Sequence, residues 1–267
     1  MEKLKSLEKR LTELSSFALA FSGGSDSTLL LALAKKIKPE KFIAFTVASQ
    51  FVPEMEIDFA KKIACSLGVQ HICLDVDILK SENIVCNTQE RCYFCKQQIF
   101  SMIRDAAKEH EIGTLVHGAN LDDLNDFRPG LKAAEELGFI SPLVDSGFSK
   151  KDVRIYSKQI GLVTWNKPSQ SCFATRIAYN EKITLEKLGM VERAENFLRD
   201  LGFAHIRVRC CGKTARIEVD PGQIDRLLDS NIRQKISLQF LQLGFVKTSI
   251  DIDGYKTGGF FDTKPLQ

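Results

Sequence analysis

The stretch FALAFSGGSDSTLLLALAKK, residues 17–36, decides the fold of this chain. Its apolar run over 17–21 predicts a buried strand, and the leucines after the loop have the spacing of a helix. A polar loop, residues 22–27, joins the two. Backbone N–H groups freed by glycines, placed just before a helix N-terminus, form a site for an anion. The stretch therefore predicts a strand, a loop and a helix that together hold a phosphate group.

The composition of this loop narrows the kind of phosphate site. Gly23 and Gly24 free the backbone, and serines at 22, 25 and 27 add hydroxyl donors. The loop lacks the lysine that ends a Walker P-loop, and it lacks the three-glycine spacing of a dinucleotide-binding turn. An ordinary glycine-rich turn with a helix cap is the alternative interpretation.

Strand-like and helical patterns alternate over the first half of the chain. Strand-like runs lie at 17–21, 42–47, 71–74 and 115–117, and helical patterns fill 27–37, 54–67 and 93–110. This alternation predicts an α/β domain over 1–165 with a doubly wound, mostly parallel sheet. Such sheets bind ligands beyond the carboxyl ends of their strands. We therefore expect the glycine loop and the segment after His117 to face one site.

The pattern changes after about Trp165, which predicts a second, smaller α+β domain over 166–267. Residues 185–201 form an amphipathic helical pattern, and HIRVRCCGKTARIEV, residues 205–219, predicts a hairpin with a Gly-Lys turn. One or two helices over 224–243 and a last strand over 245–252 follow. We expect these helices to pack on a small antiparallel sheet.

Composition limits the classes of function. The chain has 267 residues, 44% of them hydrophobic, which suffices for the cores of two domains. A formal charge of +3 and a pI near 8.3 fit anionic small molecules as well as nucleic acid. The apolar runs are shorter than the roughly 18 residues needed to span a bilayer, so we expect a soluble, cytoplasmic protein. Its eight cysteines then favour ligands or reactive thiols over disulfides.

A second polar segment follows the fourth predicted strand. In HGANLDDLNDFRPGLKAAEELGFISPL, residues 117–143, Asp122, Asp123 and Asp126 crowd a short stretch. Carboxylates in such a stretch suit metal coordination or a helix start, and Arg128 offers a planar fork for a phosphate or carboxylate. A solvated acidic loop is the alternative. The position after a strand favours a role in the predicted site.

Three cysteines form a candidate metal or sulfur site. Cys92 and Cys95 are spaced to share one helix face, and Cys172 follows much later in SQSCFATR, residues 169–176. A CxxC pair alone fits a redox motif, half of a zinc site or two core cysteines. Three thiolates can hold three irons of a [4Fe–4S] cluster and leave the fourth open, whereas zinc with three cysteines and one other ligand is the competing interpretation. No role is assigned to Cys86, Cys210 and Cys211.

The glycine loop resembles the signature SGGxDS of the ATP pyrophosphatase family, also called the N-type or PP-loop family. Its members bind ATP, adenylate a carboxylate or carbonyl oxygen, release pyrophosphate, and let a nucleophile displace AMP. The resemblance implies that Ser22, Gly23, Gly24, Asp26 and Ser27 hold the β and γ phosphates, with a Mg²⁺ ion at Asp26. The Gly-x-Asn segment at 118–120, followed by the acids, resembles a second ATP-site motif of this family.

Further segments resemble one branch of this family over nearly the whole chain. They are DFRPGLKAAEELGFISPL (126–143), TWNKPSQSCFATRI (164–177), LRDLGFAHIRVR (198–209), TARIEV (214–219) and LGFVKTSIDIDGYKTG (243–258). The branch comprises ATP-dependent sulfur transferases that convert pyridinium-3,5-biscarboxylic acid mononucleotide into its bisthiocarboxylate, a precursor of a nickel-pincer cofactor. The CxxC pair beside Cys172 resembles the type that uses a [4Fe–4S] cluster. In the other type, Cys172 alone would give up its own sulfur.

The resemblance implies a nucleotide-like substrate with one phosphate and two carboxylates. Cations must converge on such a substrate, and Arg176, Arg207 and Arg209 are the candidates, although arginines alternating on a strand are more often solvated. Lys96 would neutralise the α phosphate. The resemblance also implies a homo-oligomer, often a hexamer, without a membrane.

Three rival functions share part of these features. A tRNA-thiolating pyrophosphatase would have the loop and three cysteines, together with a broad basic surface for RNA, which a charge of +3 does not favour. An amide-forming synthetase that uses ammonia needs no cysteine site. A non-catalytic ATP-binding module would release no pyrophosphate.

Overall fold

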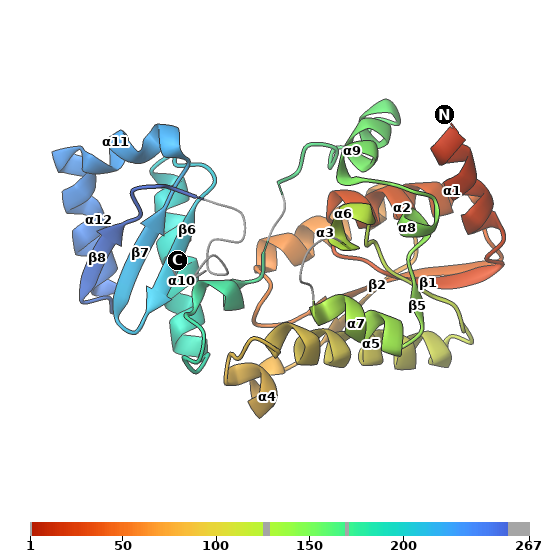
Figure 1. Cartoon of the computed structure of the whole chain (residues 1–267), viewed down its shortest axis with the longest axis horizontal. Coiled ribbons are helices and arrows are strands. Elements are labelled where there is room, and N and C mark those ends of the chain that lie inside the picture. Colours follow the sequence, from red (N-terminus) through yellow and green to blue (C-terminus); the bar gives the residue numbers. More distant parts are fainter. Residues whose placement is uncertain (1, 125–128, 169–170, 256–267) are drawn as a thin grey trace, which may run out of the picture. The chain divides into compact units, whose positions relative to one another are not determined.

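A computed structural model describes residues 2–124, 129–168 and 171–255 of the chain (Figure 1). The chain forms two compact units. The first comprises Met1–Ile78 and Glu90–Gln170, and the second comprises Leu79–Gln89 and Ser171–Gln267. The second unit thus takes in a short segment from the first half of the sequence.

The first unit is built on a five-stranded sheet. Its strands are β1 (Ser16–Ala20), β2 (Lys41–Ala48), β3 (His71–Asp75), β4 (Leu115–Val116) and β5 (Phe139–Ile140). Their order is β3-β2-β1-β4-β5, and every neighbouring pair is parallel. The predicted doubly wound parallel sheet is confirmed. β5 was not predicted, because two residues carry no periodicity.

Helices cover both faces of this sheet (Figure 1). One face packs against α1 (Glu2–Thr12), α2 (Ser25–Ile37), α3 (Glu54–Ser66), α8 (Pro142–Asp145) and α9 (Lys150–Gln159). The other packs against α5 (Arg91–Glu109) and α7 (Pro129–Glu136). The short helices α6 (Leu121–Leu124) and η1 (Ile78–Lys80) lie in connections. Among the described residues, none of the helices has the length and apolar character of a membrane span.

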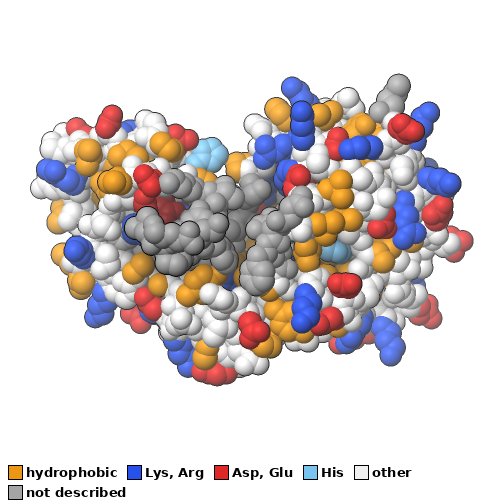
Figure 2. Space-filling view, viewed as in Figure 1, with side chains coloured by type: hydrophobic (Ala, Val, Ile, Leu, Met, Phe, Trp, Pro, Cys, Tyr) orange, Lys and Arg blue, Asp and Glu red, His pale blue; other side chains and the backbone are white. Residues whose placement is uncertain are grey.

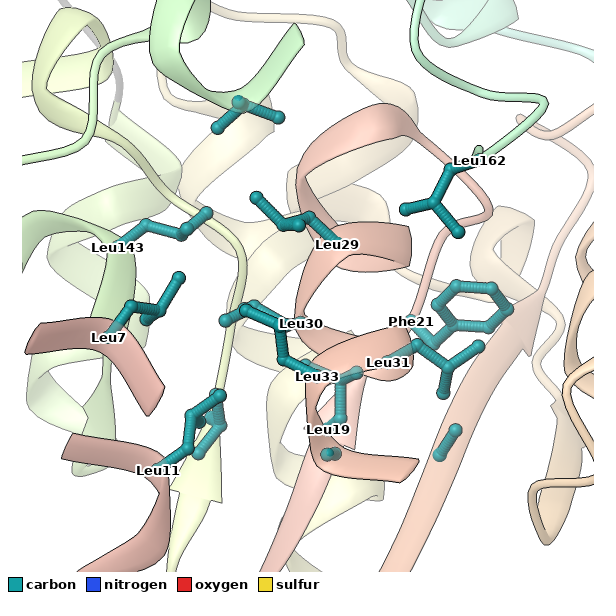
Figure 3. Close-up of a cluster of buried hydrophobic side chains, with 14 of the residues drawn as sticks. Leu7, Leu11, Leu19, Phe21, Leu29, Leu30, Leu31, Leu33, Leu143 and Leu162 are labelled. Atoms are coloured by element: carbon teal, nitrogen blue, oxygen red, sulfur yellow. The ribbon is translucent and has the colours of Figure 1, made fainter. Parts of the chain in front are cut away.

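The core explains why the opening stretch forms these elements. Phe17 and Leu19 of β1 are buried against the α2 side, whereas Ala18, between them, faces the α5 side. Figure 3 shows Leu7 and Leu11 of α1 pointing toward the leucines of α2. Leu7 and Leu11 of α1, with Leu29, Leu30 and Leu31 of α2, are fully buried, and each such side chain stabilises the fold by roughly 1.5–3 kcal/mol. Packing of α1 and α2 therefore holds the phosphate loop at the end of β1.

The strand order places a ligand site. From β1 the sheet grows through β2 to β3 on one side, and through β4 to β5 on the other. Connections from β1 and β4 therefore leave toward opposite faces, which opens a crevice at their carboxyl ends. The phosphate loop at 21–24 and the segment at 117–120 are the two connections that flank this crevice.

The second unit packs helices on a three-stranded sheet. Its strands are β6 (Arg207–Cys211), β7 (Thr214–Glu218) and β8 (Lys247–Ile250). Its helices are α4 (Glu82–Val85), η2 (Phe173–Arg176), α10 (Leu185–Asp200), η3 (Pro221–Gln223), α11 (Ile224–Leu228) and α12 (Ser230–Gln242). β6 and β7 form the predicted hairpin, but β8 pairs parallel to β7, so the expectation of an antiparallel sheet is wrong for this strand. The chain returns through α11 and α12 before it enters β8, and this crossover sets the parallel direction.

Candidate functional site

The phosphate loop lies between the end of β1 and the start of α2. Gly23 has a φ of +67°, and a Cβ on it would lie 3.1 Å from Ala60 Cβ, so the turn requires glycine. The Ser22 N–H donates to Ser27 Oγ at 3.3 Å, and the Gly24 N–H donates to Ser22 Oγ at 3.4 Å. The first N–H groups of α2 have no acceptor within the helix. The loop therefore offers the donor set of an anion site.

The segment after β4 closes the second side of this loop. Gly118 lies against the first turn of α2. A Cβ on Gly118 would lie 3.1 Å from Ser27 N. The buried Asn120 amide donates to Asp26 Oδ1 at 3.0 Å. These contacts bring the two segments together, and that they face one ligand site stays a prediction.

The Asp26 carboxylate has partners besides Asn120. The Lys150 ammonium forms an ion pair with Asp26 Oδ2, and the Ser25 hydroxyl donates to the same oxygen at 3.4 Å. Lys150 is the first residue of α9, so this pair ties the start of α9 to the loop. Within 2–124, 129–168 and 171–255, no three His, Cys, Asp or Glu side chains are grouped as a metal site. Magnesium at Asp26 stays a prediction.

Lys167 also reaches the phosphate loop. Its ammonium donates to the Gly23 carbonyl at 3.2 Å and to Glu56 Oε2 at 2.7 Å. The same ammonium lies 3.8 Å from the centroid of the Phe59 ring. These contacts join the loop, the start of α3 and the segment that follows α9. No spacing rule in the sequence assigns Lys167 to the loop.

The acidic residues after β4 organise their own segment. Asp123 Oδ2 accepts from the Asn120 N–H at 3.0 Å, and Asp122 Oδ2 accepts from the Lys150 N–H at 2.7 Å. Both contacts fix backbone next to the groups that hold Asp26. Asp126 and Arg128, which the sequence also assigns to this site, lie outside the described residues.

Cys92 and Cys95 lie in the first turns of α5, and both are partly exposed. Helix geometry places residues three apart on one face. The Arg91 guanidinium donates to Cys92 Sγ at 3.5 Å, which puts a positive charge beside this sulfur. Lys96, predicted to meet the α phosphate, is exposed, and its ammonium lies 5.4 Å from the Phe100 ring centroid.

Cys172 belongs to the second unit, where it directly precedes η2 with a partly exposed side chain. Arg176 is buried, and its Nε donates to Glu195 Oε1 at 3.0 Å. Arg176 Nη1 donates to the carbonyls of Ser171 at 2.7 Å and of Cys172 at 3.0 Å. The guanidinium therefore fixes the backbone that carries the Cys172 thiol.

The two other predicted arginines lie on β6. Arg209 makes a buried bidentate pair with Glu218, at 2.8 Å to Oε1 and 2.9 Å to Oε2. Arg207 is buried with its guanidinium 5.0 Å from the Tyr255 ring, and within the described residues its Nε has no hydrogen-bond partner. Burial and the nearby charge of Arg176 lower the pKa of Arg207. Arg176 and Arg209 each face a buried carboxylate, and Arg207 forms no ion pair in the described part of the chain.

His117, next to the crevice, lies among aromatic rings. Its ring centroid is 6.0 Å from that of Phe100 and 6.4 Å from that of Phe139. Burial, and then the charge of Lys96, lower the pKa of His117 to about 4. The imidazole is therefore neutral at neutral pH.

Comparison with known proteins assigns the chain to a family. The asparagine synthase family model matches residues 4–95, which include the phosphate loop. An uncharacterized protein of Synechocystis is 36% identical over 256 residues, which cover 96% of either chain. The pyridinium-3,5-bisthiocarboxylic acid mononucleotide synthase of Lactiplantibacillus plantarum is 34% identical over 262 residues, 98% of this chain and 94% of that synthase. The chain belongs to the PP-loop ATP pyrophosphatase family.

A more distantly similar protein matches a smaller part of the chain. A GMP synthase of Aeropyrum pernix is 25% identical over 219 residues, which cover 74% of this chain and 42% of that protein. The sequence signature of the PP-loop family includes the loop residues and Asn120, whose part in ATP binding stays a prediction. It did not locate Lys150 and Lys167, whose contacts with the loop span more than 100 residues of sequence.

Proposed function

We propose that this chain is an ATP-dependent sulfurtransferase of the cytoplasm that acts on pyridinium-3,5-biscarboxylic acid mononucleotide. It converts both carboxylates into thiocarboxylates for the synthesis of a nickel-pincer cofactor. One observation carries the proposal: the 34% identity, over 98% of this chain, with a pyridinium-3,5-bisthiocarboxylic acid mononucleotide synthase. The donor set of the phosphate loop supports the use of ATP.

The first half-reaction activates a carboxylate. The N–H groups and hydroxyls of the loop would bind the β and γ phosphates of ATP, and Asp26 would hold the accompanying Mg²⁺. An oxygen of the substrate carboxylate attacks the α phosphorus, and the bond from that phosphorus to pyrophosphate breaks. Lys96 neutralises the α phosphate in this step. The acyl-adenylate that forms accepts a nucleophile at carbon, which a free carboxylate resists.

The second half-reaction exchanges oxygen for sulfur. Sulfide attacks the acyl carbon, a C–S bond forms, the C–O bond to AMP breaks, and a thiocarboxylate remains. A second ATP serves the other carboxylate. Because the substrate is a small dicarboxylate held in one site, each turn needs the adenylate and the sulfur source within bonding distance.

We assign the sulfur source to Cys92, Cys95 and Cys172, which would hold a [4Fe–4S] cluster through one thiolate each. When bound, the cluster supplies a fourth iron with an open position for sulfide. All three thiols are free and partly exposed, and the Arg91 charge beside Cys92 would offset part of the negative charge of a thiolate ligand. Arg176 holds the Cys172 carbonyl and so positions this thiol.

Arg207 and Arg209 are the proposed partners of the substrate's phosphate and carboxylates. Arg207 fits this role because its buried Nε lacks a hydrogen-bond partner among the described residues. A buried donor without a partner costs roughly 1–3 kcal/mol, and an anionic ligand would remove that cost. Glu218 pairs with Arg209 through both carboxylate oxygens and so holds that guanidinium in one orientation.

Metal and activity measurements on cysteine variants test the proposal. Protein purified without oxygen should contain about four irons per chain, and Cys92→Ser, Cys95→Ser and Cys172→Ser should each lose them. Cys65→Ser, at an exposed cysteine of α3, is the matched control and should keep the iron. With Mg·ATP, the wild type should release AMP and pyrophosphate only when the pyridinium dicarboxylate is present.

Three results would overturn parts of this assignment. If the protein contains zinc instead of iron, the assignment of a [4Fe–4S] cluster is wrong. A Cys172 that loses the mass of hydrogen sulfide during turnover, in protein without iron, would make this residue the sacrificial donor. Thiolation of tRNA would point to the RNA-modifying branch, although Lys and Arg side chains are interspersed with Asp and Glu over the face in Figure 2.

We also propose that the protein is a homo-oligomer. Apolar side chains of the second unit support this, since Leu238 and Leu241 of α12 are 58% and 62% exposed, and Val246 is 69% exposed. Sedimentation should give a particle larger than one chain, and Leu241→Glu should reduce its mass. A wild type that sediments as a single chain would contradict the proposal.

A further inference from the structure

We infer that Lys167 is a positioning residue of the phosphate loop, which holds the Gly23–Gly24 peptide in the orientation that presents its N–H to the phosphates. The inference rests on the proposed use of ATP. It adds to the loop a residue that lies outside the SGGxDS signature. The Lys167 side chain is 15% exposed, and its ammonium donates to the Gly23 carbonyl at 3.2 Å.

The geometry of the peptide bond gives this contact its effect. In a trans peptide the C=O and N–H groups point in opposite directions. The carbonyl of Gly23 and the N–H of Gly24 belong to one peptide plane, so an ammonium that holds the carbonyl on one side turns the N–H to the other. On that side the Gly24 N–H donates to Ser22 Oγ at 3.4 Å, among the other polar groups of the loop.

Gly23 needs such a restraint. Glycine populates positive and negative φ about equally, so the peptides on either side of it rotate more freely than in other residues. Gly23 has a φ of +67° and lies next to Ala60, and the Lys167 ammonium holds its carbonyl. A hydrogen bond from a charged donor is about twice as strong as a neutral one, which makes Lys167 an effective restraint.

Because Glu56 neutralises the Lys167 ammonium, Lys167 acts by orienting the Gly23 carbonyl rather than by attracting the phosphates through its charge. The Glu56 carboxylate lies 2.7 Å from the ammonium and is itself only 16% exposed, so the pair is neutral as a unit. The same ammonium lies 3.8 Å from the centroid of the Phe59 ring, which belongs to α3 as Glu56 does. Residues of α3 thus hold the Lys167 ammonium in place, and from there it donates to the Gly23 carbonyl.

Binding of ligands with and without phosphates tests the inference. We compare Mg·ATP, Mg·pyrophosphate and adenosine on the full chain by calorimetry. Lys167→Met keeps the apolar stem and removes the donor, and it should weaken ATP and pyrophosphate about tenfold while leaving adenosine unchanged. The Gly24 amide resonance should shift in Lys167→Met even without ligand, because the peptide loses its fixed orientation.

The chain offers a matched control. The Lys35 ammonium donates to the Gly68 carbonyl at 2.9 Å, and Gly68 also has a positive φ, of +61°. This pair repeats the contact of Lys167 away from the loop, so Lys35→Met should leave all three affinities unchanged. Lys167→Arg, which keeps a charged donor, should restore most of the pyrophosphate affinity.

Two outcomes overturn the inference. Lys167→Met that binds Mg·pyrophosphate as tightly as the wild type removes any role in the loop. Glu56→Gln that loses as much affinity as Lys167→Met would mean that the pair only holds α3 in place, since orientation of the carbonyl needs the ammonium alone. A wild type that binds no Mg·ATP would instead contradict the proposed function, which separates the two failures.

Discussion

Gly23 shows at the residue scale how one backbone angle supports the site. Replacement by alanine at a φ of +67° costs about 1–2 kcal/mol in the left-handed region, and the new Cβ would also press on Ala60 at 3.1 Å. We therefore expect Gly23→Ala to lower the free energy of unfolding by at least about 1–2 kcal/mol. The same change should weaken pyrophosphate binding. Urea denaturation and calorimetry measure the two effects.

Gly68→Ala separates the angle from the crowding. Its φ of +61° is nearly the same, but the nearest atom to a new Cβ is the mobile Lys35 ammonium, at 3.5 Å. Gly68→Ala should then cost only about 1 kcal/mol and leave pyrophosphate binding intact. Equal losses of stability in the two variants would contradict the role of Ala60.

His117 predicts how stability depends on pH. The pKa of His117 in the folded chain is about 4, because burial and the Lys96 charge oppose protonation, whereas an unfolded histidine has a pKa of about 6.5. As the pH falls below roughly 6.5, His117 takes up a proton in the unfolded chain. In the folded chain it takes up this proton only near pH 4. The free energy of unfolding should thus fall between these values, by at most about 3 kcal/mol.

His117→Leu removes this titration. The carboxylates that titrate in the same range are common to both proteins, so the difference between their urea-derived stabilities isolates the histidine. We expect this difference to change between about pH 6.5 and 4 and to be constant above and below. A difference that does not vary with pH would show that the imidazole is not desolvated in the folded chain.

Elements differ in how far their sequence could predict them. α2 and α10 carry long apolar periodicity, and their expected bounds differ from the observed ones by no more than two residues. β5 has two residues and no pattern of its own, so only its pairing with β4 defines it. β8 has a strand pattern, but its direction depends on the crossover through α12 rather than on its residues. Local composition thus specifies an element, and tertiary pairing specifies its neighbours.

The β6–β7 hairpin makes a prediction at the same scale. Arg209 and Glu218 are 5% and 3% exposed, so removing one charge leaves the other buried without its partner. Glu218→Gln should destabilise the protein by about 3–5 kcal/mol, because a desolvated guanidinium then lacks its bidentate acceptor. Arg209→Met combined with Glu218→Leu should recover most of this loss, as measured by urea denaturation. A double variant no more stable than Glu218→Gln would contradict the cost of the orphaned charge.

At the scale of the molecule, the sequence predicted the parts of the site that lie within one motif. Ser22, Gly24 and Ser27 are neighbours in sequence, and their loop follows from the strand and helix that flank it. Lys150 and Lys167 reach the loop only because α9 packs on α2, and no local pattern encodes that packing. The same limit applies to the partners of Arg176 and Arg209, which come from other elements of the second unit. Long-range pairing of charges is therefore what the sequence left open.

Two compact units with separate cores predict two steps of thermal unfolding. The phosphate loop belongs to the first unit, so Mg·ATP at 100 times its dissociation constant should stabilise that unit by about 2.7 kcal/mol and raise one calorimetric transition. Glu218 belongs to the second unit, so Glu218→Gln should lower the other transition and leave the ATP-dependent shift unchanged. One transition that moves with both the ligand and the variant would mean that the units unfold together, and the stability of the arginine pairs would then be coupled to occupancy of the phosphate loop.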